Sequence, residues 1–237
     1  MRFRTSNPIL YRIERNVVTS ENAVTYRNVA IKTIFLILLT AASGYFAVAN
    51  LAYFNYGYLI AASIIGTIAV FVGIFSIKLA PYAAVVYSIC EGVVLGIITL
   101  FFEIEYPGIA ITAISTTLIV LLIMMLLYST DIIKVDQRFA SFMVVAMISI
   151  IIMSIFMLIF GLLESGSTSG LYIGVCVLST IIAALYLFMD FEHIKRSVQL
   201  GVDARYGWTL ALGLMVSLIW LYVEILRLLA IFSRRRN

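Results

Sequence analysis

Seven long apolar stretches constrain the fold of this chain more than any other feature. Each holds about 20 mostly hydrophobic residues, the length that an α-helix needs to cross the hydrocarbon core of a bilayer. They occupy residues 30–50, 58–77, 82–102, 108–128, 139–163, 171–191 and 207–232. Their apolar residues run continuously instead of alternating, which favours helices over the strands of a membrane barrel. The sequence therefore predicts an all-α polytopic membrane protein with seven transmembrane helices.

Composition supports this class. The chain is 63% hydrophobic and 12% charged, whereas a soluble domain carries about 25% charged residues. Short connections between the stretches leave no room for a catalytic domain outside the membrane. We expect two parts: a cytoplasmic basic tail at residues 1–28 and a seven-helix transmembrane domain at residues 29–237.

Positive charges indicate how the bundle is oriented. The tail is rich in arginine, and every second connection after it is basic, whereas the alternate connections carry only acids. The basic ones hold Lys78, then Lys134 and Arg138, then Lys195, Arg196 and Arg205; the acids are Glu103, Glu105 and Glu164. By the positive-inside rule, the N-terminus is predicted to be cytoplasmic. Seven spans would then place the C-terminal arginines on the far side, unless the last segment bends and the tail returns.

Three acids lie inside the apolar stretches, where a charge costs several kcal/mol. They are Glu91, Asp190 and Glu224. Each has a structural alternative to a functional role. Asp190 could be an acid reaching out from a helix end, Glu224 could form an ion pair with Arg227, and Glu91 could be packed and hydrogen-bonded.

Two of these acids lie on polar helix faces. Asp190 shares its face with Tyr186, and Glu224 shares its face with Ser217. Two facing carboxyl groups in a low dielectric would share a proton and titrate as a pair. Deprotonation would separate them or recruit a cation. The pair can meet only if the last segment enters the bilayer late or bends.

The sequence contains none of the common catalytic or nucleotide-binding motifs. An intramembrane aspartyl protease needs a motif such as Gly-x-Gly-Asp, whereas Asp190 stands in Phe-Met-Asp-Phe. We therefore expect no enzymatic activity and no bound cofactor. The net charge of +4 is assigned to membrane orientation, and no nucleic-acid partner is expected.

Four motifs resemble the transmembrane Bax inhibitor motif family, in particular its bacterial branch. They are Glu91-Gly92 with Leu95-Gly96, Tyr106-Pro107-Gly108-Ile109, Leu185-Tyr186 through Asp190-Phe191, and Trp220 through Leu229. The resemblance covers the chain from about residue 25 to its end.

The resemblance implies six helices around a central seventh, with two acids on the last two helices forming a pH-sensitive latch over a calcium-leak path. Asp190 and Glu224 occupy the positions of these acids, and Lys78 matches a basic residue that assists the latch in some members. The chain departs from the family in having glutamate as the second acid and a longer linker between the two acids.

These observations predict a pH-sensitive cation (calcium) leak channel in the plasma membrane of a bacterium, gated by Asp190 and Glu224. Its partners would be the lipid bilayer, calcium and protons. The alternative is a non-transporting regulator that uses the basic tail to bind membrane proteases or survival factors. A proton-coupled transporter would need inverted repeats, which the sequence does not show.

Overall fold

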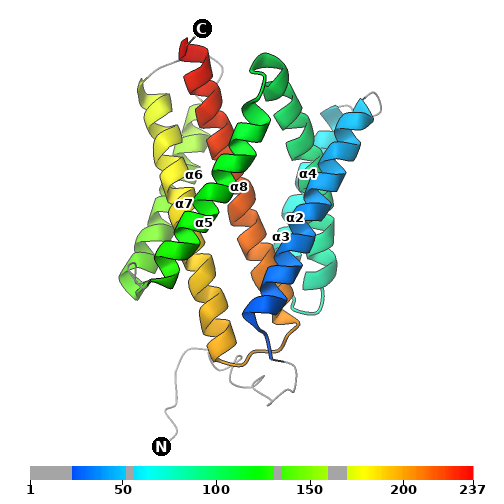
Figure 1. Ribbon diagram of the computed structural model, residues 1–237, viewed down its shortest axis with the longest axis vertical. Helices are drawn as coiled ribbons and strands as arrows, with labels where there is room; N and C mark the ends of the chain where they lie inside the picture. The colour runs from blue at the N-terminus through cyan, green and yellow to red at the C-terminus, as the bar shows by residue number, and fades with distance from the viewer. Residues whose placement is uncertain (1–22, 52–55, 131–134, 160–169, 237) are drawn as a thin grey trace, which may run out of the picture. The chain divides into compact units, whose positions relative to one another are not determined.

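In a computed structural model, residues 23–51, 56–130, 135–159 and 170–236 are described. Within these ranges the chain forms seven α-helices, each long and apolar enough to cross a membrane (Figure 1). They are α2 (Tyr26–Ala49), α3 (Tyr56–Phe75), α4 (Ala80–Glu105), α5 (Ile109–Ser129), α6 (Gln137–Ile159), α7 (Gly170–Gln199) and α8 (Tyr206–Arg236). The all-α fold with seven spans is thus confirmed. Residues 1–22 of the predicted tail, with Lys134 and Glu164, lie outside the described ranges.

Helix α7 continues well beyond the predicted end of its span. It ends at Gln199 instead of residue 191, because the polar residues that follow the apolar run are also good helix formers. Glu192 and Arg196 form an ion pair one turn apart in this extension. Asp190 therefore lies nine residues, or about 13 Å, from the helix end instead of close to it.

Helix α8 is unbroken from Tyr206 to Arg236. At 1.5 Å per residue its length is about 46 Å, more than the hydrocarbon core of a bilayer. A segment that turned back within the membrane would have to leave the helical conformation, which α8 does not. The structure therefore contradicts the alternative in which the last segment bends and returns its basic tail.

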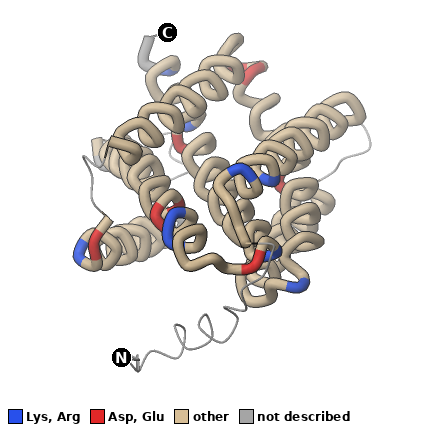
Figure 2. The backbone as a smooth tube through the Cα atoms, turned by 60° about the horizontal axis from the view of Figure 1, so that its bottom comes forward, with Lys and Arg blue, Asp and Glu red and all other residues tan. Residues whose placement is uncertain are grey.

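The described chain divides into two compact units. The first comprises the residues up to Gly96 together with Glu192–Met215, and the second comprises Ile97–Phe191 and the residues from Val216 onward. Helices α4, α7 and α8 contribute to both units. Charged residues are sparse along all the helices (Figure 2), and large apolar side chains cover their exposed faces, as expected of surfaces that contact lipid.

In the first unit, α2 and α4 approach so closely that their backbones nearly touch. A Cβ atom added to Gly96 would lie 2.6 Å from the carbonyl oxygen of Gly44, and the Thr40 hydroxyl donates a 3.1 Å hydrogen bond to the Ser88 carbonyl. Small residues allow this contact. Gly92 and Gly96 of α4 thus lie directly against the backbone of α2.

The start of α2 is tied to the connection between α7 and α8. The Val24 N–H donates a 2.7 Å hydrogen bond to the Val202 carbonyl, and the Lys32 ammonium donates a 2.8 Å hydrogen bond to the Ala204 carbonyl. Thr25 caps α2 by accepting a hydrogen bond from the Asn28 N–H. The start of α2 and the connection between α7 and α8 therefore lie at the same end of the first unit.

In the second unit, α7 and α8 carry the core. Met143 and Ile150 of α6 pack with Ile182 and Met189 of α7, and Trp220 of α8 covers this cluster. In the most apolar stretch of each helix, half of the residues of α8 and 44% of those of α7 are buried, against 6% for α6. The two helices that bear Asp190 and Glu224 are thus the most buried in the described part of the chain.

Candidate functional site

Asp190 is a buried acid in the interior of α7. The residue is only 8% exposed, and the Ser217 hydroxyl of α8 lies within hydrogen-bonding range of its carboxyl group. The Oδ2 atom is buried and has no hydrogen-bond partner among the described residues. An acid reaching out from a helix end does not fit this placement. Asp190 is instead a buried carboxyl group with one oxygen that has no partner among the described residues.

One turn along the same face of α7, Tyr186 contacts Trp220 of α8. Their ring centroids are 6.1 Å apart at an interplanar angle of 65°, an edge-to-face arrangement. This aromatic contact lies between the level of Asp190 and the level of Glu224 on α8. The two aromatic side chains therefore separate the two acids along the helices.

Glu224 is buried in α8, 5% exposed, and has two partners on its own helix. The Arg227 guanidinium donates 3.4 Å hydrogen bonds to both carboxylate oxygens, and the Trp220 indole N–H donates to Oε1 at 3.4 Å. The side chain of Arg227 is 40% exposed. The ion pair between Glu224 and Arg227, which the sequence offered as an alternative, is therefore present.

The structure does not bring the two acids together. Asp190 meets α8 at Ser217, seven residues before Glu224, which corresponds to about 10 Å along the helix. No hydrogen bond or ion pair joins the two carboxyl groups in the described part of the chain. The expected proton-sharing contact is absent here, and each acid has its own surroundings.

Beyond Glu224, the polar contacts continue to residues of α7 that the sequence analysis did not select. Cys176, 1% exposed, hydrogen-bonds through its thiol with both Tyr172 and Arg227. Ser179 is 2% exposed, and its hydroxyl has no partner among the described residues. The signal was present in the sequence, since Tyr172 and Cys176 continue the steps of three and four that lead through Ser179 to Asp190.

Together these side chains form a row of polar and aromatic groups along α7 and α8, which we call the α7–α8 polar row. It consists of Asp190, Tyr186, Ser179, Cys176 and Tyr172 of α7, with Ser217, Trp220, Glu224 and Arg227 of α8. Tyr186 and Ser217, both selected from the sequence, belong to it. The row contains the only two acids of the described ranges that are less than 9% exposed.

Glu91 and Lys78 belong to the first unit. Glu91 is half-buried on α4, and its Oε1 atom would lie 3.8 Å from a Cβ atom added to Gly66 of α3. Lys78 is exposed in the turn between α3 and α4. The acids of the α7–α8 polar row lie in the second unit, so the supporting roles assigned to Glu91 and Lys78 stay predictions.

A closed calcium site is not formed by these side chains. Calcium takes six to eight oxygen ligands, whereas the described residues contain no group of three or more His, Cys, Asp or Glu side chains that could hold a metal ion. A calcium ion in the α7–α8 polar row would therefore meet one carboxylate at a time.

Comparison with known families supports the family resemblance that the four sequence motifs indicate. The family described as Bax inhibitor 1 like matches residues 7–234, nearly the whole chain. A comparison with curated proteins gives no significant match. With seven helices long and apolar enough to cross a membrane, the chain is an integral membrane protein that belongs to the Bax inhibitor 1 like family.

Proposed function

We propose that this protein is a non-enzymatic, pH-sensitive cation leak channel with calcium as the expected ion. The α7–α8 polar row forms its path, and Asp190 and Glu224 form its gate. One observation carries the proposal: Asp190 holds a buried carboxyl oxygen without a partner among the described residues, inside a helix long enough to span the membrane. Intramembrane acids of this kind mark ion and proton pathways in other membrane proteins.

The pH response follows from the surroundings of Asp190. A carboxyl group in a low dielectric is less costly to bury when it is protonated and neutral than when it is ionised. In the neutral form it attracts no cation and stays against Ser217. In the ionised form it needs a counter-charge, which a cation entering the row supplies. Flux is therefore expected to rise as the pH increases.

Glu224 would act as a second station for the ion. Its carboxylate is held by Arg227 and Trp220 about 10 Å further along α8 from the level of Asp190. A leak path needs sites that bind a cation weakly enough to release it. A carboxylate already paired with a guanidinium meets this requirement. The two acids would then act in series and not as one proton-sharing latch.

Calcium flux from loaded liposomes tests this proposal. The wild-type protein is compared across pH 6–8 with Asp190→Asn, Glu224→Gln and, as a control, Glu192→Gln, an acid of α7 that is paired with Arg196. We expect Asp190→Asn to abolish the pH response and Glu224→Gln to lower the flux while keeping the response. Glu192→Gln should behave as the wild type. A flux that is independent of pH and unchanged by both gate substitutions would refute the proposal.

The fold offers support for a cytoplasmic N-terminus in a plasma membrane. The hydrogen bond between Val24 and Val202 places the start of α2 beside the connection that contains Arg205. Arg27 in the first turn of α2 and the basic residues at the end of α7 thus lie at one end of the first unit. That is the arrangement that the positive-inside rule requires of a cytoplasmic side.

The alternative, a non-transporting regulator, is motivated by the arginine-rich tail and stays a prediction. Its test is deletion of the tail, and the structure shows where the deletion should stop. Val24 is 1% exposed and Thr25 caps α2, so both belong to the folded part. Deleting residues 1–22 should leave the flux unchanged. A cellular phenotype that is lost in this deletion but kept in Asp190→Asn would favour the regulator.

A further inference from the structure

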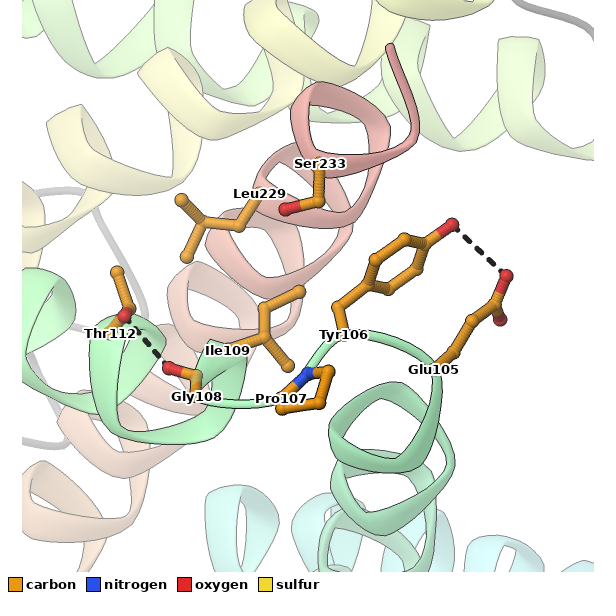
Figure 3. A pocket seen from close by; sticks show the side chains of 8 residues that line it. All are labelled: Glu105, Tyr106, Pro107, Gly108, Ile109, Thr112, Leu229 and Ser233. Atoms are coloured by element: carbon orange, nitrogen blue, oxygen red, sulfur yellow. Dashed lines mark hydrogen bonds between the residues drawn. The ribbon is translucent and has the colours of Figure 1, made fainter. Parts of the chain in front are cut away.

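A cavity of about 310 Å³ lies in the second unit, away from the α7–α8 polar row. It is an open pocket bordered by the turn between α4 and α5 and by the last turns of α8 (Figure 3). Glu105 and Tyr106 form its polar wall with Thr112 and Ser233, and Ile109 and Leu229 form its apolar wall. Neither the leak path nor the gate uses any of these side chains.

The cavity lies where membrane-spanning helices end. Glu105 is the last residue of α4, Ile109 is the first of α5, and Ser233 is three residues from the end of α8. Helix α8 is longer than the hydrocarbon core is thick, and the arginines that follow Ser233 suit the headgroup region better than the hydrocarbon. Exposed apolar side chains stand next to lining residues in the sequence: Ile104, 70% exposed, precedes Glu105, and Ile111, 71% exposed, precedes Thr112. A lipid chain can cover these side chains.

The turn that forms the polar wall is held in place by Glu103. Its carboxylate accepts hydrogen bonds from the Gly108 N–H at 2.7 Å and the Ala110 N–H at 2.9 Å. Gly108 has a φ angle of 86°, which glycine adopts at little cost. The backbone donors at the start of α5 are thereby satisfied within the chain. The acid that faces the cavity is Glu105, whose carboxylate accepts a 3.0 Å hydrogen bond from the Tyr106 hydroxyl.

The wall carries groups of opposite charge that match a zwitterion. A carboxylate next to a tyrosine ring suits an ammonium group, which pairs with the acid and lies against the ring. Arg234 follows Ser233 and is close enough to Tyr106 to interact with it electrostatically. A guanidinium is well suited to a phosphate group. The cavity thus has an acid and a tyrosine ring in its lining, and a guanidinium follows the lining residue Ser233 in the sequence.

We propose that this cavity binds the headgroup of an ethanolamine phospholipid, with its ammonium at Glu105 and Tyr106 and its phosphate at Arg234. A primary ammonium can donate hydrogen bonds to the Glu105 carboxylate, which the trimethylated ammonium of choline lipids cannot. The position at the membrane boundary and the adjoining apolar side chains favour a lipid over a soluble molecule with the same headgroup.

Native mass spectrometry of the full chain in detergent tests the proposal, with phosphatidylethanolamine, phosphatidylcholine and phosphatidylglycerol as the lipids. The wild type should bind the ethanolamine lipid most tightly. Glu105→Gln should weaken that binding about three- to tenfold, a modest factor because the acid is exposed, and should leave binding of the glycerol lipid unchanged. Arg234→Gln should weaken both, because both lipids carry the phosphate. Glu192→Gln is the matched control and should change neither.

Three results would overturn this assignment. One is equal binding of the ethanolamine and glycerol lipids by the wild type. Another is competition by soluble phosphoethanolamine at concentrations similar to those of the lipid, which would identify a free molecule as the occupant. The third is a Glu105→Gln variant with altered calcium flux and unaltered lipid binding, which would make the cavity a mouth of the leak path. Lipid selectivity is measured without transport, so the proposal stands apart from the channel function.

Discussion

Replacing Gly96 by alanine should destabilise the protein by an amount that the geometry of the first unit sets. A Cβ atom at this position would lie 2.6 Å from the carbonyl oxygen of Gly44, 2.7 Å from its Cα and 2.9 Å from its carbonyl carbon. Carbon atoms prefer separations of about 3.5–4.0 Å. All three contacts are with backbone, so no side-chain rotation relieves them. Helix α2 would have to move away from α4 by most of an ångström.

Such overpacking costs about 1–3 kcal/mol. Alanine in a helix interior returns about 0.5–1 kcal/mol relative to glycine. Because all three contacts are with backbone, the cost should fall in the upper part of its range, and a net loss of about 1–2 kcal/mol is expected. For a chain of this size, each kcal/mol lowers Tm by about 2–4 °C. The expected decrease is therefore about 2–8 °C, measured as thermal unfolding of the full-length protein in detergent by tryptophan fluorescence.

Gly174→Ala is the matched control, since it makes the same chemical change in another membrane helix. A Cβ atom at Gly174 of α7 would have no neighbour within 4 Å. The Tm of this variant should stay equal to the wild-type value or rise. If the two variants melt together, or if Gly96→Ala is the more stable, the contact between α2 and α4 is not as close as described and the argument fails.

The second unit supplies two further predictions. Arg227→Gln should cost more stability in the wild type than in a Glu224→Gln background. A double-mutant cycle should give a coupling of about 0.5–2 kcal/mol, because Glu224 is buried while Arg227 is partly exposed. Additive effects would mean that the ion pair contributes nothing to stability. Glu103→Gln should lower stability in chemical or thermal unfolding, because an amide offers one acceptor oxygen for the two N–H groups at Gly108 and Ala110. Glu105→Gln, which loses no backbone hydrogen bond, should cost less, and an equal cost would contradict this account of the turn.

The fold could be predicted from the sequence because hydropathy reports how the chain crosses a bilayer. All seven apolar stretches are helices, and their centres agree with the prediction. Helix ends were harder to predict, because an apolar run marks the edge of the hydrocarbon and not the end of the helix. Polar residues from Glu192 to Gln199 continue α7 outside the apolar run. This extension changed the interpretation of Asp190 from an acid near a helix end to one in its interior.

The candidate site could be predicted in part. Helical spacing placed Tyr186 with Asp190 and Ser217 with Glu224, and all four belong to the α7–α8 polar row. Cys176 was missed because its sequence neighbours are apolar and a cysteine in a span usually packs as a small apolar residue. The contact between the two acids could not be judged either, because it depends on the register between two helices. Periodicity within one helix gives no information on that register.

The register of α7 and α8 explains why the two acids lie apart. The two helices run antiparallel. Asp190 contacts Ser217 and Tyr186 contacts Trp220, so a step of four residues toward the start of α7 corresponds to a step of three residues toward the end of α8. The next step along both helices leads to Glu224 on α8 and to Ala183 on α7. Ala183 is fully buried and its side chain has no polar group. For Asp190 to reach Glu224, α8 would have to slide by about two turns, or 10 Å. Such a movement would disrupt the packing of Trp220 on the core of the second unit. Under the proposed function, gating would then be a local change at Asp190 and Ser217, with Glu224 as a separate site further along the row.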